Sequence, residues 1–231
     1  MTNVKVLDLG GSIVAPEEVD VTFIKQFKIF LEKWLKEDLK NKAIIVIGGG
    51  SPARKYQKAY REIVEVGDNS EQDWIGITAT RLNAQLIKAV FSEYCPSEVV
   101  IDPTAPEKFD GQVMVAAGWK PGWSTDYDAV ILAEKFGADT IYNLSNIAKV
   151  YTADPNKDPD AKPLDYVSWD EYKKMAGDEW IPGNNVPFDP VATKKAAELN
   201  LQVIAAAGKD LTNLQNIFDG KEFFGTIIGR K

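Results

Sequence analysis

The stretch AIIVIGGGSPAR, from Ala43 to Arg54, decides the fold. Its first five residues are apolar and mostly β-branched, which predicts a fully buried strand of the kind found in parallel sheets. Three glycines follow, and then come Ser51, a favourable helix N-cap, and Pro52, which suits a first helical position. The stretch therefore predicts a strand, a glycine turn and a helix.

This glycine turn is a candidate anion site. Bare backbone N–H groups can approach an anion there, and the helix dipole adds positive potential. Arg54 lies in the first helical turn and can add a two-pronged contact. A turn that binds nothing is the alternative for the glycines, and a solvated helix residue is the alternative for Arg54. A second glycine turn, Gly10 to Ser12, follows the apolar run Val4–Leu9.

Length and composition bound the class of protein. The chain has 231 residues, of which 45% are hydrophobic and 26% charged, as in a globular domain with a sizeable core. A net charge of −7 argues against a nucleic-acid surface. The sequence has neither an apolar run of membrane-spanning length nor a signal-peptide pattern. We therefore expect a cytoplasmic protein that binds neither nucleic acid nor membrane.

The chain contains no histidine. This excludes Ser-His-Asp and Cys-His catalysis, histidine general bases and histidine metal ligands. The single cysteine, Cys95, excludes an internal disulfide and is expected to be a buried packing residue. The chemistry must come from carboxylates, Lys, Arg, backbone amides and a hard metal ion.

Strands and helices are expected to alternate along the chain. Hydrophobic patterns predict strands at 4–9, 43–47, 98–101, 113–117, 140–144, 202–206 and 226–228. Helices are expected at 17–40, 52–66, 73–91, 126–136, 189–199 and 211–218, with a short one after the capping box at Ser168. This order predicts an α/β fold, a three-layer α/β/α sandwich around a mostly parallel sheet. Ligands of such folds bind at the carboxyl ends of the strands, where both glycine turns lie.

Neither glycine turn completes a Walker or a Rossmann motif. Two such turns on neighbouring strands instead suggest two phosphate-bearing ligands that face each other. That arrangement suits phosphoryl transfer, in which catalysis is mostly positioning and charge stabilisation.

Six segments in order carry a more specific pattern: DLGGS (8–12), GGGSPAR (48–54), DWIGITATRLNA (73–84), GWKPGWSTDYDAVILAE (118–134), SNIAKVYTADPNKDPDAK (145–162) and DPVATKKA (189–196). With them the chain resembles the amino acid kinase superfamily, and within it the UMP kinases of the archaeal type. The resemblance implies ATP-dependent phosphorylation of UMP to UDP with Mg²⁺. It also implies one amino acid kinase-like domain, with an acceptor-binding lobe at 1–137 and an ATP-binding lobe at 138–231, and a homohexamer built as a trimer of dimers.

The resemblance also implies roles for particular residues. The residues that bind ATP would be Gly10, Gly11, Ser12, Ser145, Asn146, Tyr151, Asp154, Pro155 and Lys162. The residues that bind UMP would be Gly49, Gly50, Arg54, Asp73, Gly76, Gly118, Ser124 and Thr125. Asp126, Asp8 and Lys162 would act in catalysis, with Asp126 also a ligand of Mg²⁺. Helix N-caps are the alternative reading for Asp73 and for Thr125–Asp126, and a solvated turn is the alternative for Asp154–Pro155.

The chain departs from the superfamily pattern at two places. Many members have a lysine two residues before the first glycine turn, where this chain has Asp8, and Lys149 stands where the family usually has glycine. Because cations must face the transferring phosphoryl group, we consider Lys149, Lys162, Lys120 and a Mg²⁺ ion bound by Asp126 and Asp8 as replacements. Two alternatives to a UMP kinase stay open: a kinase with another small acidic acceptor, and a non-catalytic nucleotide-binding or storage protein of the same fold.

Overall fold

The computed structural model of the chain describes residues 3–64, 67–153, 158–177 and 187–230. Its strands are β1 (Asn3–Leu9), β2 (Asn41–Ile47), β3 (Val113–Ala116), β4 (Thr140–Ser145), β5 (Tyr166–Val167), β6 (Gln202–Ala207) and β7 (Thr226–Gly229). They form one sheet in the order β3-β2-β1-β4-β6-β7-β5. Only the β6–β7 pair is antiparallel among these strands, which confirms the mostly parallel sheet.

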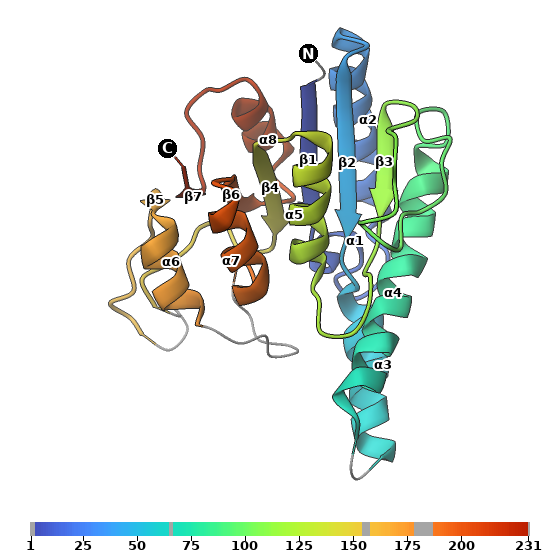
Figure 1. Cartoon of the computed structure of the whole chain (residues 1–231), viewed down its shortest axis with the longest axis vertical. Coiled ribbons are helices and arrows are strands. Elements are labelled where there is room, and N and C mark those ends of the chain that lie inside the picture. The colour runs from blue at the N-terminus through green and yellow to red at the C-terminus, as the bar shows by residue number, and fades with distance from the viewer. Residues whose placement is uncertain (1–2, 65–66, 154–157, 178–186, 231) are drawn as a thin grey trace.

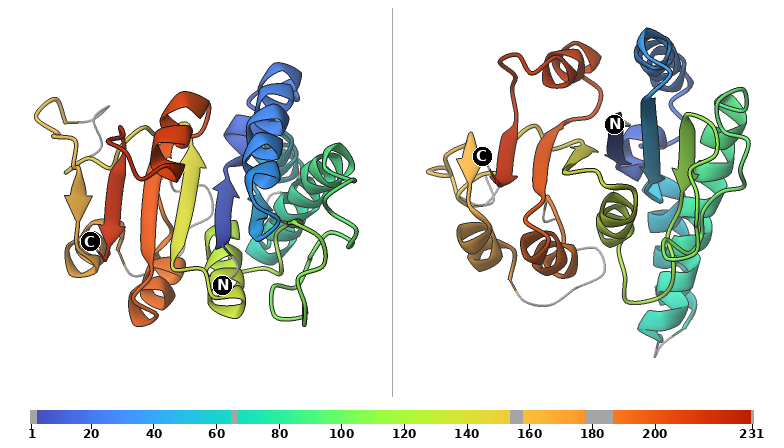
Figure 2. Two further views of the ribbon diagram at one scale, coloured as in Figure 1. Left: turned by 90° about the horizontal axis from the view of Figure 1, so that it is seen from above. Right: turned by 45° about the horizontal axis from the view of Figure 1, so that its top comes forward.

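Helices cover both faces of this sheet (Figures 1 and 2). They are α1 (Gly11–Val14), α2 (Val21–Glu37), α3 (Gly50–Ile63), α4 (Asn69–Val90), α5 (Thr125–Phe136), α6 (Trp169–Ala176), α7 (Pro190–Glu198) and α8 (Leu211–Phe218). Residues of α2, α4 and α8 share one hydrophobic core, and residues of α5, α6 and α7 share the other. The expected α/β/α sandwich is confirmed.

The strands bury alternate residues in the two cores. In β2, Ile45 and Ile47 face the α2 side, whereas Ile44 and Val46 face the α5 side. All four are fully buried, as the unbroken apolar run predicts for a strand covered on both faces. The two cores fix the carboxyl ends of β1, β2, β4 and β6 at one edge of the sheet. At that edge α3 and α4 run side by side and project beyond the strands (Figure 1).

Several expected boundaries differ from those of the structure. The first long helix starts at Val21 because Asp20 caps it, accepting a hydrogen bond from the Phe23 N–H at 2.9 Å. Residues 98–101 form no extended strand, only a bridge between Val100 and Ala116. The two-residue strand β5 was not expected. No helix in the described ranges is both long and apolar enough to cross a membrane.

The helix N-caps also differ from the predictions. Helix α3 starts at Gly50 and its N-cap is Gly49, so Ser51 is buried inside the first turn and does not cap it. Helix α4 starts at Asn69 under an Asp68 cap, which excludes the N-cap reading of Asp73. Ser124, not Thr125 or Asp126, caps α5. The carboxylates of Asp73 and Asp126 are therefore available for other contacts.

Candidate active site

The two glycine turns touch each other, backbone to backbone. A Cβ atom added to Gly11 would lie 2.0 Å from the Gly50 nitrogen, and one added to Gly48 would lie 2.4 Å from the Gly11 nitrogen. Gly50 has a φ of +65°, and its own Cβ would lie 2.5 Å from the Gly11 oxygen. Glycine is therefore required at this contact by both space and backbone conformation. The contact brings the amino ends of α1 and α3 together, where first-turn N–H groups have no partner inside their helix.

Helix α4 supports this contact through Asn83, which the sequence analysis did not single out. The Asn83 side-chain amide is buried and donates hydrogen bonds to the carbonyls of Gly48 (2.9 Å) and Gly49 (3.1 Å). Since a buried amide needs partners, these bonds tie the second glycine turn to α4. A lone Asn at a helical position carries no signal of this role in the sequence.

Three carboxyl groups meet next to the glycine turns. Asp8 is the next-to-last residue of β1, Asp126 lies in the first turn of α5, and Asp189 caps α7 by accepting from the N–H groups of Val191 and Ala192. Asp126 hydrogen-bonds the Asp8 carboxyl and accepts from the Asp189 N–H at 2.7 Å. Ser124 donates its hydroxyl to Asp189. The structure thus brings the predicted Asp8, Asp126 and Ser124 together and adds Asp189, which the sequence analysis treated only as a helix start.

Burial sets the protonation of these carboxyls. Burial raises the pKa of Asp8 to about 6, although hydrogen bonds from Asp126 and Asn143 oppose the shift. The pKa of Asp126 is raised well above its ordinary value by burial first, and then by the charges of Asp8 and Asp189. Burial also raises the pKa of Asp189. Desolvated like charges favour a bound proton or a bound cation, so the cluster is suited to a cation.

Two of these residues, Asp8 and Asp126, line a cavity of about 200 Å³, the carboxylate cavity. Its lining comprises Asp8, Gly10, Gly11, Gly48, Thr125, Asp126, Asn143, Leu144, Ser145, Asn146, Ile147 and Pro187. The Asn143 side-chain oxygen is buried there without a hydrogen-bond partner. Mg²⁺ prefers oxygen ligands and usually takes one or two carboxylates together with substrate phosphates. In the described ranges no three acidic, cysteine or histidine residues are grouped to hold a metal alone. The carboxyls of Asp8 and Asp126 and the Asn143 oxygen are ligands that fit a Mg²⁺ ion shared with a phosphate ligand.

A larger cavity of about 470 Å³, the cationic cavity, lies beside the first. It is lined by Ser12, Ile13, Pro16, Arg54, Ser145, Asn146, Ala207 and Lys209. Ser145 and Asn146 line both cavities. Arg54, which the resemblance assigns to UMP, therefore shares a cavity with Ser12, Ser145 and Asn146, which it assigns to ATP. Arg54 also donates to the Pro16 carbonyl at 2.9 Å.

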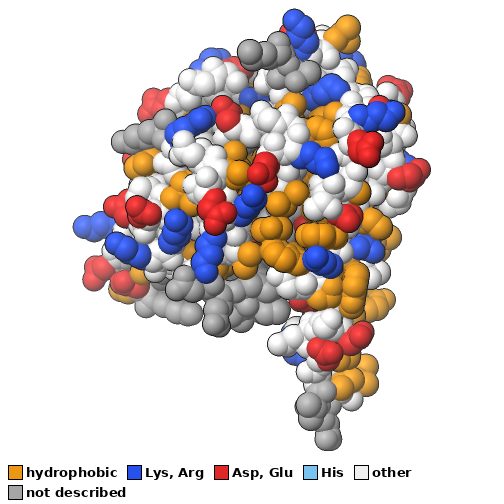
Figure 3. Space-filling view, viewed as in Figure 1, with side chains coloured by type: hydrophobic (Ala, Val, Ile, Leu, Met, Phe, Trp, Pro, Cys, Tyr) orange, Lys and Arg blue, Asp and Glu red, His pale blue; other side chains and the backbone are white. Residues whose placement is uncertain are grey.

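Other residues assigned to UMP lie where α4 meets the loop at 118–124. The Asp73 carboxylate accepts from the Gly122 N–H at 2.9 Å, and the Gly118 N–H donates to the Thr80 hydroxyl at 2.9 Å. A Cβ on Gly76 would lie 2.7 Å from the Gln57 amide nitrogen of α3. Hydrophobic side chains gather over this loop and the adjacent end of α5 (Figure 3). The Trp123 ring lies between the rings of Trp119 and Tyr127 and is tilted against both, with centroids 5.9 and 4.2 Å away.

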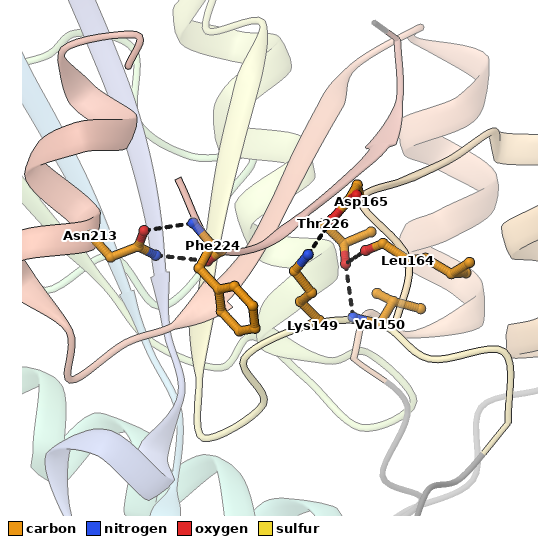
Figure 4. Close-up of polar contacts among 7 residues, drawn as sticks. All are labelled: Lys149, Val150, Leu164, Asp165, Asn213, Phe224 and Thr226. Atoms are coloured by element: carbon orange, nitrogen blue, oxygen red, sulfur yellow. Dashed lines mark hydrogen bonds and ion pairs between the residues drawn. The ribbon is translucent and has the colours of Figure 1, made fainter. Parts of the chain in front are cut away.

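The structure contradicts the hypothesis that Lys149 serves the transfer site. Lys149 is buried, pairs with Asp165 and lies 4.6 Å from the centre of the Phe224 ring (Figure 4). The next residue, Val150, donates its N–H to Thr226 of β7 at 2.9 Å. Lys149 thus fixes the segment after β4 to the β7 side of the fold, and it lines neither cavity. Its partners Asp165 and Phe224 lie 16 and 75 positions later in the chain, so local sequence patterns do not predict these contacts.

Two further candidate lysines also lie outside the cavity linings. Lys120 lies 3.7 Å from the centre of the Trp119 ring. Lys162 is exposed, and its backbone bonds Thr152 next to the bridge between Tyr151 and Pro163. Asp154 and Pro155, assigned to ATP, lie outside the described residues. Among the predicted ATP residues, the structure brings Gly10, Gly11, Ser12, Ser145 and Asn146 together at the two cavities.

Comparison with known proteins identifies the family of this chain. A sequence model of the amino acid kinase family matches residues 3–205. The chain belongs to the amino acid kinase family. Within that family it is 34% identical to the uridylate kinase of Methanospirillum hungatei, over 97% of this chain and 94% of that one. It is also 34% identical to the uridylate kinase of Thermococcus kodakarensis, over 96% of this chain and 98% of that one.

A solved structure of the family supports the fold. The uridylate kinase of Archaeoglobus fulgidus superposes with a TM-score of 0.82 and is 31% identical, over 99% of this chain and 100% of that one. Most residues that line the two cavities fall inside the stretch matched by the amino acid kinase family model, but Ala207 and Lys209 follow it.

Proposed function

We propose that this member of the amino acid kinase family is a uridylate kinase, which transfers the γ-phosphoryl group of ATP to UMP and yields UDP and ADP. One observation carries the proposal: two glycine turns touch at the carboxyl ends of the adjacent strands β1 and β2. Two phosphate-binding turns in contact hold two phosphate groups within reach of each other, which is the main requirement of phosphoryl transfer. Full-length similarity to uridylate kinases supports the choice of acceptor.

The proposal assigns the first turn to the donor and the second turn to the acceptor. Gly10, Gly11, Ser12, Ser145 and Asn146 would cradle the ATP phosphates, with Lys162 near them, and Tyr151, Asp154 and Pro155 would shape the adenine side. Gly49, Gly50 and Arg54 would hold the UMP phosphate, and Asp73, Gly76, Gly118, Ser124 and Thr125 would surround its ribose and base. The acceptor lobe is then 1–137 and the donor lobe 138–231, and the assembly is a homohexamer.

The acceptor needs no general base. A phosphate monoester is already largely ionised near neutral pH, since its second pKa is about 6. The absence of histidine from the chain is therefore compatible with the reaction. Asp126 and Asp8, with the unpartnered oxygen of Asn143 beside them, would hold Mg²⁺ together with the donor phosphates. Bound there, Mg²⁺ would supply charge neutralisation on the phosphate oxygens.

A coupled assay of ADP release with ATP tests the proposal. The purified chain is assayed with UMP, CMP, AMP or no acceptor, and the nucleotide products are separated by chromatography. We expect rapid ADP release with UMP and formation of UDP in equal amount. Turnover with another acceptor alone would identify a kinase of different specificity. Nucleotide binding without turnover in any mixture would identify a non-catalytic binding protein, and either result would contradict the proposal.

A further inference from the structure

The cationic cavity is lined by Lys209, which the sequence does not single out as a site residue. This lysine also lies after residues 3–205, the stretch that the family model matches. Lys209 lies two residues after β6 and lines this cavity with Ser12 of α1 and Ser145 at the end of β4. These positions place Lys209 at the carboxyl edge of the sheet, in the same cavity as Arg54 of α3. Lys209 and Arg54 are the two charged residues in the lining, in a chain whose net charge is −7.

The turn that carries Lys209 is fixed to its neighbours. The Gly208 N–H donates to the Ser145 carbonyl at 2.8 Å. A Cβ on Gly208 would lie 3.1 Å from both the Leu144 carbonyl carbon and the Ile13 side chain. The turn before Lys209 is therefore packed against α1 and the end of β4, where Ser145 is one of the residues that the proposed function assigns to ATP.

The segment at 15–20, between α1 and α2, holds both cations. Lys209 pairs with Asp20 at 2.5 Å, and Arg54 donates to the Pro16 carbonyl. The Ser51 N–H donates to the Ala15 carbonyl at 2.8 Å, which joins this segment to α3 as well. The Lys209 hydrogen bond is also the main cause that lowers the pKa of Asp20. Since the Lys209 side chain is 49% exposed, its ammonium group is held near the cavity but is free to exchange partners.

We propose that Lys209 is the donor-side cation of this enzyme: its ammonium group contacts the phosphates of the nucleoside triphosphate in the cavity that it shares with Arg54. This inference rests on the proposed function and supplies the positive charge that Asp8 cannot supply. As the transfer proceeds, an oxygen of the acceptor phosphate gives its electron pair to the γ-phosphorus. The electron pair of the bond to the bridging oxygen leaves with ADP. Negative charge grows on the donor side, where the Lys209 ammonium group stabilises it.

Lys209→Met, Lys209→Arg and Asp20→Asn test the proposal together. Asp20→Asn removes the ion pair but leaves the lysine and an N-capping residue for α2, since Asn is as good an N-cap as Asp. Lys221→Met is the matched control, because Lys221 is an exposed lysine paired with Asp219 at 2.8 Å. Steady-state kinetics with ATP and UMP are measured for each variant. Calorimetric titration with ADP and with inorganic tripolyphosphate then measures phosphate binding without turnover.

We expect Lys209→Met to lower kcat/KM for ATP by about tenfold or more and to weaken tripolyphosphate binding, because a charged contact is lost. The KM for UMP should change less. Lys209→Arg should restore most of the activity. Asp20→Asn and Lys221→Met should stay within about threefold of wild type, since exposed ion pairs contribute little.

Two results would overturn the proposal. One is a folded Lys209→Met variant with wild-type tripolyphosphate binding and wild-type kcat/KM for ATP. The other is an equal loss in Lys209→Met and Asp20→Asn, which would make the lysine a structural partner of α2. The binding titration does not depend on the acceptor. Failure of UMP as a substrate is therefore distinguishable from failure of Lys209 to bind phosphate.

Discussion

The two cavities share Ser145 and Asn146 but carry opposite charge. The cationic cavity is lined by Arg54 and Lys209, whereas the carboxylate cavity is lined by Asp8 and Asp126. Anions bind where N–H groups and cations converge, and a hard metal ion binds where carboxylates do. In our account the first cavity therefore binds phosphates, and the second would hold the Mg²⁺ ion that neutralises their charge. Substitutions in the first should act mainly on substrate binding, and substitutions in the second mainly on kcat.

Asp126→Asn should have the largest effect. The amide keeps an oxygen to accept from the Asp189 N–H but removes the charge. We expect kcat to fall by about a hundredfold or more, because electrostatic stabilisation of the transfer is lost. The control is Asp139→Asn, which removes an exposed carboxylate at the opposite edge of the sheet, where it pairs with Arg230. The kcat of Asp126→Asn is measured across a Mg²⁺ titration. A value close to wild type would show that the carboxylate cavity takes no part in phosphoryl transfer.

Gly50→Ala tests the contact that joins the two cavities. The new methyl group would overlap the Gly11 and Ala15 carbonyls at a positive φ. We expect a loss of about 3 kcal/mol or more in the free energy of unfolding, because both strain and overlap oppose it. Gly122→Ala is the matched control, since Gly122 has a φ of +84° but open space around it. Thermal denaturation should show a clearly larger loss for Gly50→Ala, and equal losses would mean that the turns are not packed as described.

Arg54→Ala tests the acceptor side of the cationic cavity. We expect the KM for UMP to rise far more than the KM for ATP, by an amount equivalent to about 2–3 kcal/mol for a lost two-pronged charged contact. Arg61→Ala, at a position in the last turn of the same helix, is the control. Equal changes in both KM values would mean that Arg54 does not distinguish the two phosphates.

Asp128→Asn tests how burial affects the carboxyls of α5. Asp128 is fully buried, accepts from the Trp119 N–H and has one unpartnered oxygen, and burial raises its pKa to about 8. Between about pH 4 and pH 8 the unfolded chain releases this proton while the folded chain retains it, so stability falls as the pH rises. Because asparagine does not titrate, Asp128→Asn removes this loss of stability at higher pH. In EDTA, its melting temperature relative to wild type should therefore rise steadily from pH 5 to pH 8.

The comparison variant for that trend is Asp102→Asn. The Thr104 hydrogen bond holds the pKa of Asp102, a half-buried residue, below its ordinary value. Its charged form therefore stabilises the fold above the ordinary carboxyl pKa, and its replacement should slightly lower the melting temperature at pH 8. A melting-temperature difference for Asp128→Asn that does not change with pH would show that Asp128 is ionised in the folded protein.

Lys149→Met should have the smallest effect on catalysis. Because Lys149 pairs with Asp165 and packs on Phe224 away from both cavities, we expect kcat and both KM values close to wild type. A modest loss of thermal stability should be the main change. A tenfold fall in kcat, equivalent to about 1.4 kcal/mol, would show that Lys149 acts at the transfer site after all.

Much of the fold could be predicted from local patterns. The apolar run before Gly48 predicts β2 and its burial on both faces, and the glycine turns mark the carboxyl edge of the sheet. Helix starts were less accurate because several capping residues compete locally, as Asp68 and Asp73 do for α4. The sequence could not predict that residues 98–101 would form only one bridge.

The site was only partly predictable for a different reason. Asp8 and Asp126 were found through the resemblance, whereas Asp189 enters the cluster because α7 packs against α5. Lys209 and Arg54 lie 155 residues apart in the chain and share a cavity only because β2, β1, β4 and β6 are successive neighbours in the sheet. Local sequence patterns do not report such long-range contacts.

The division of labour between the cavities can be measured directly with ADP, which binds without turnover. Calorimetric titrations in EDTA compare wild type, Lys209→Met and Asp126→Asn. We predict that Lys209→Met weakens ADP binding by about tenfold. Asp126→Asn should bind ADP about as tightly as wild type, because without a cation the buried Asp126 carboxyl favours a bound proton and the substitution removes little charge. The opposite order, with binding lost in Asp126→Asn and kept in Lys209→Met, would contradict the account.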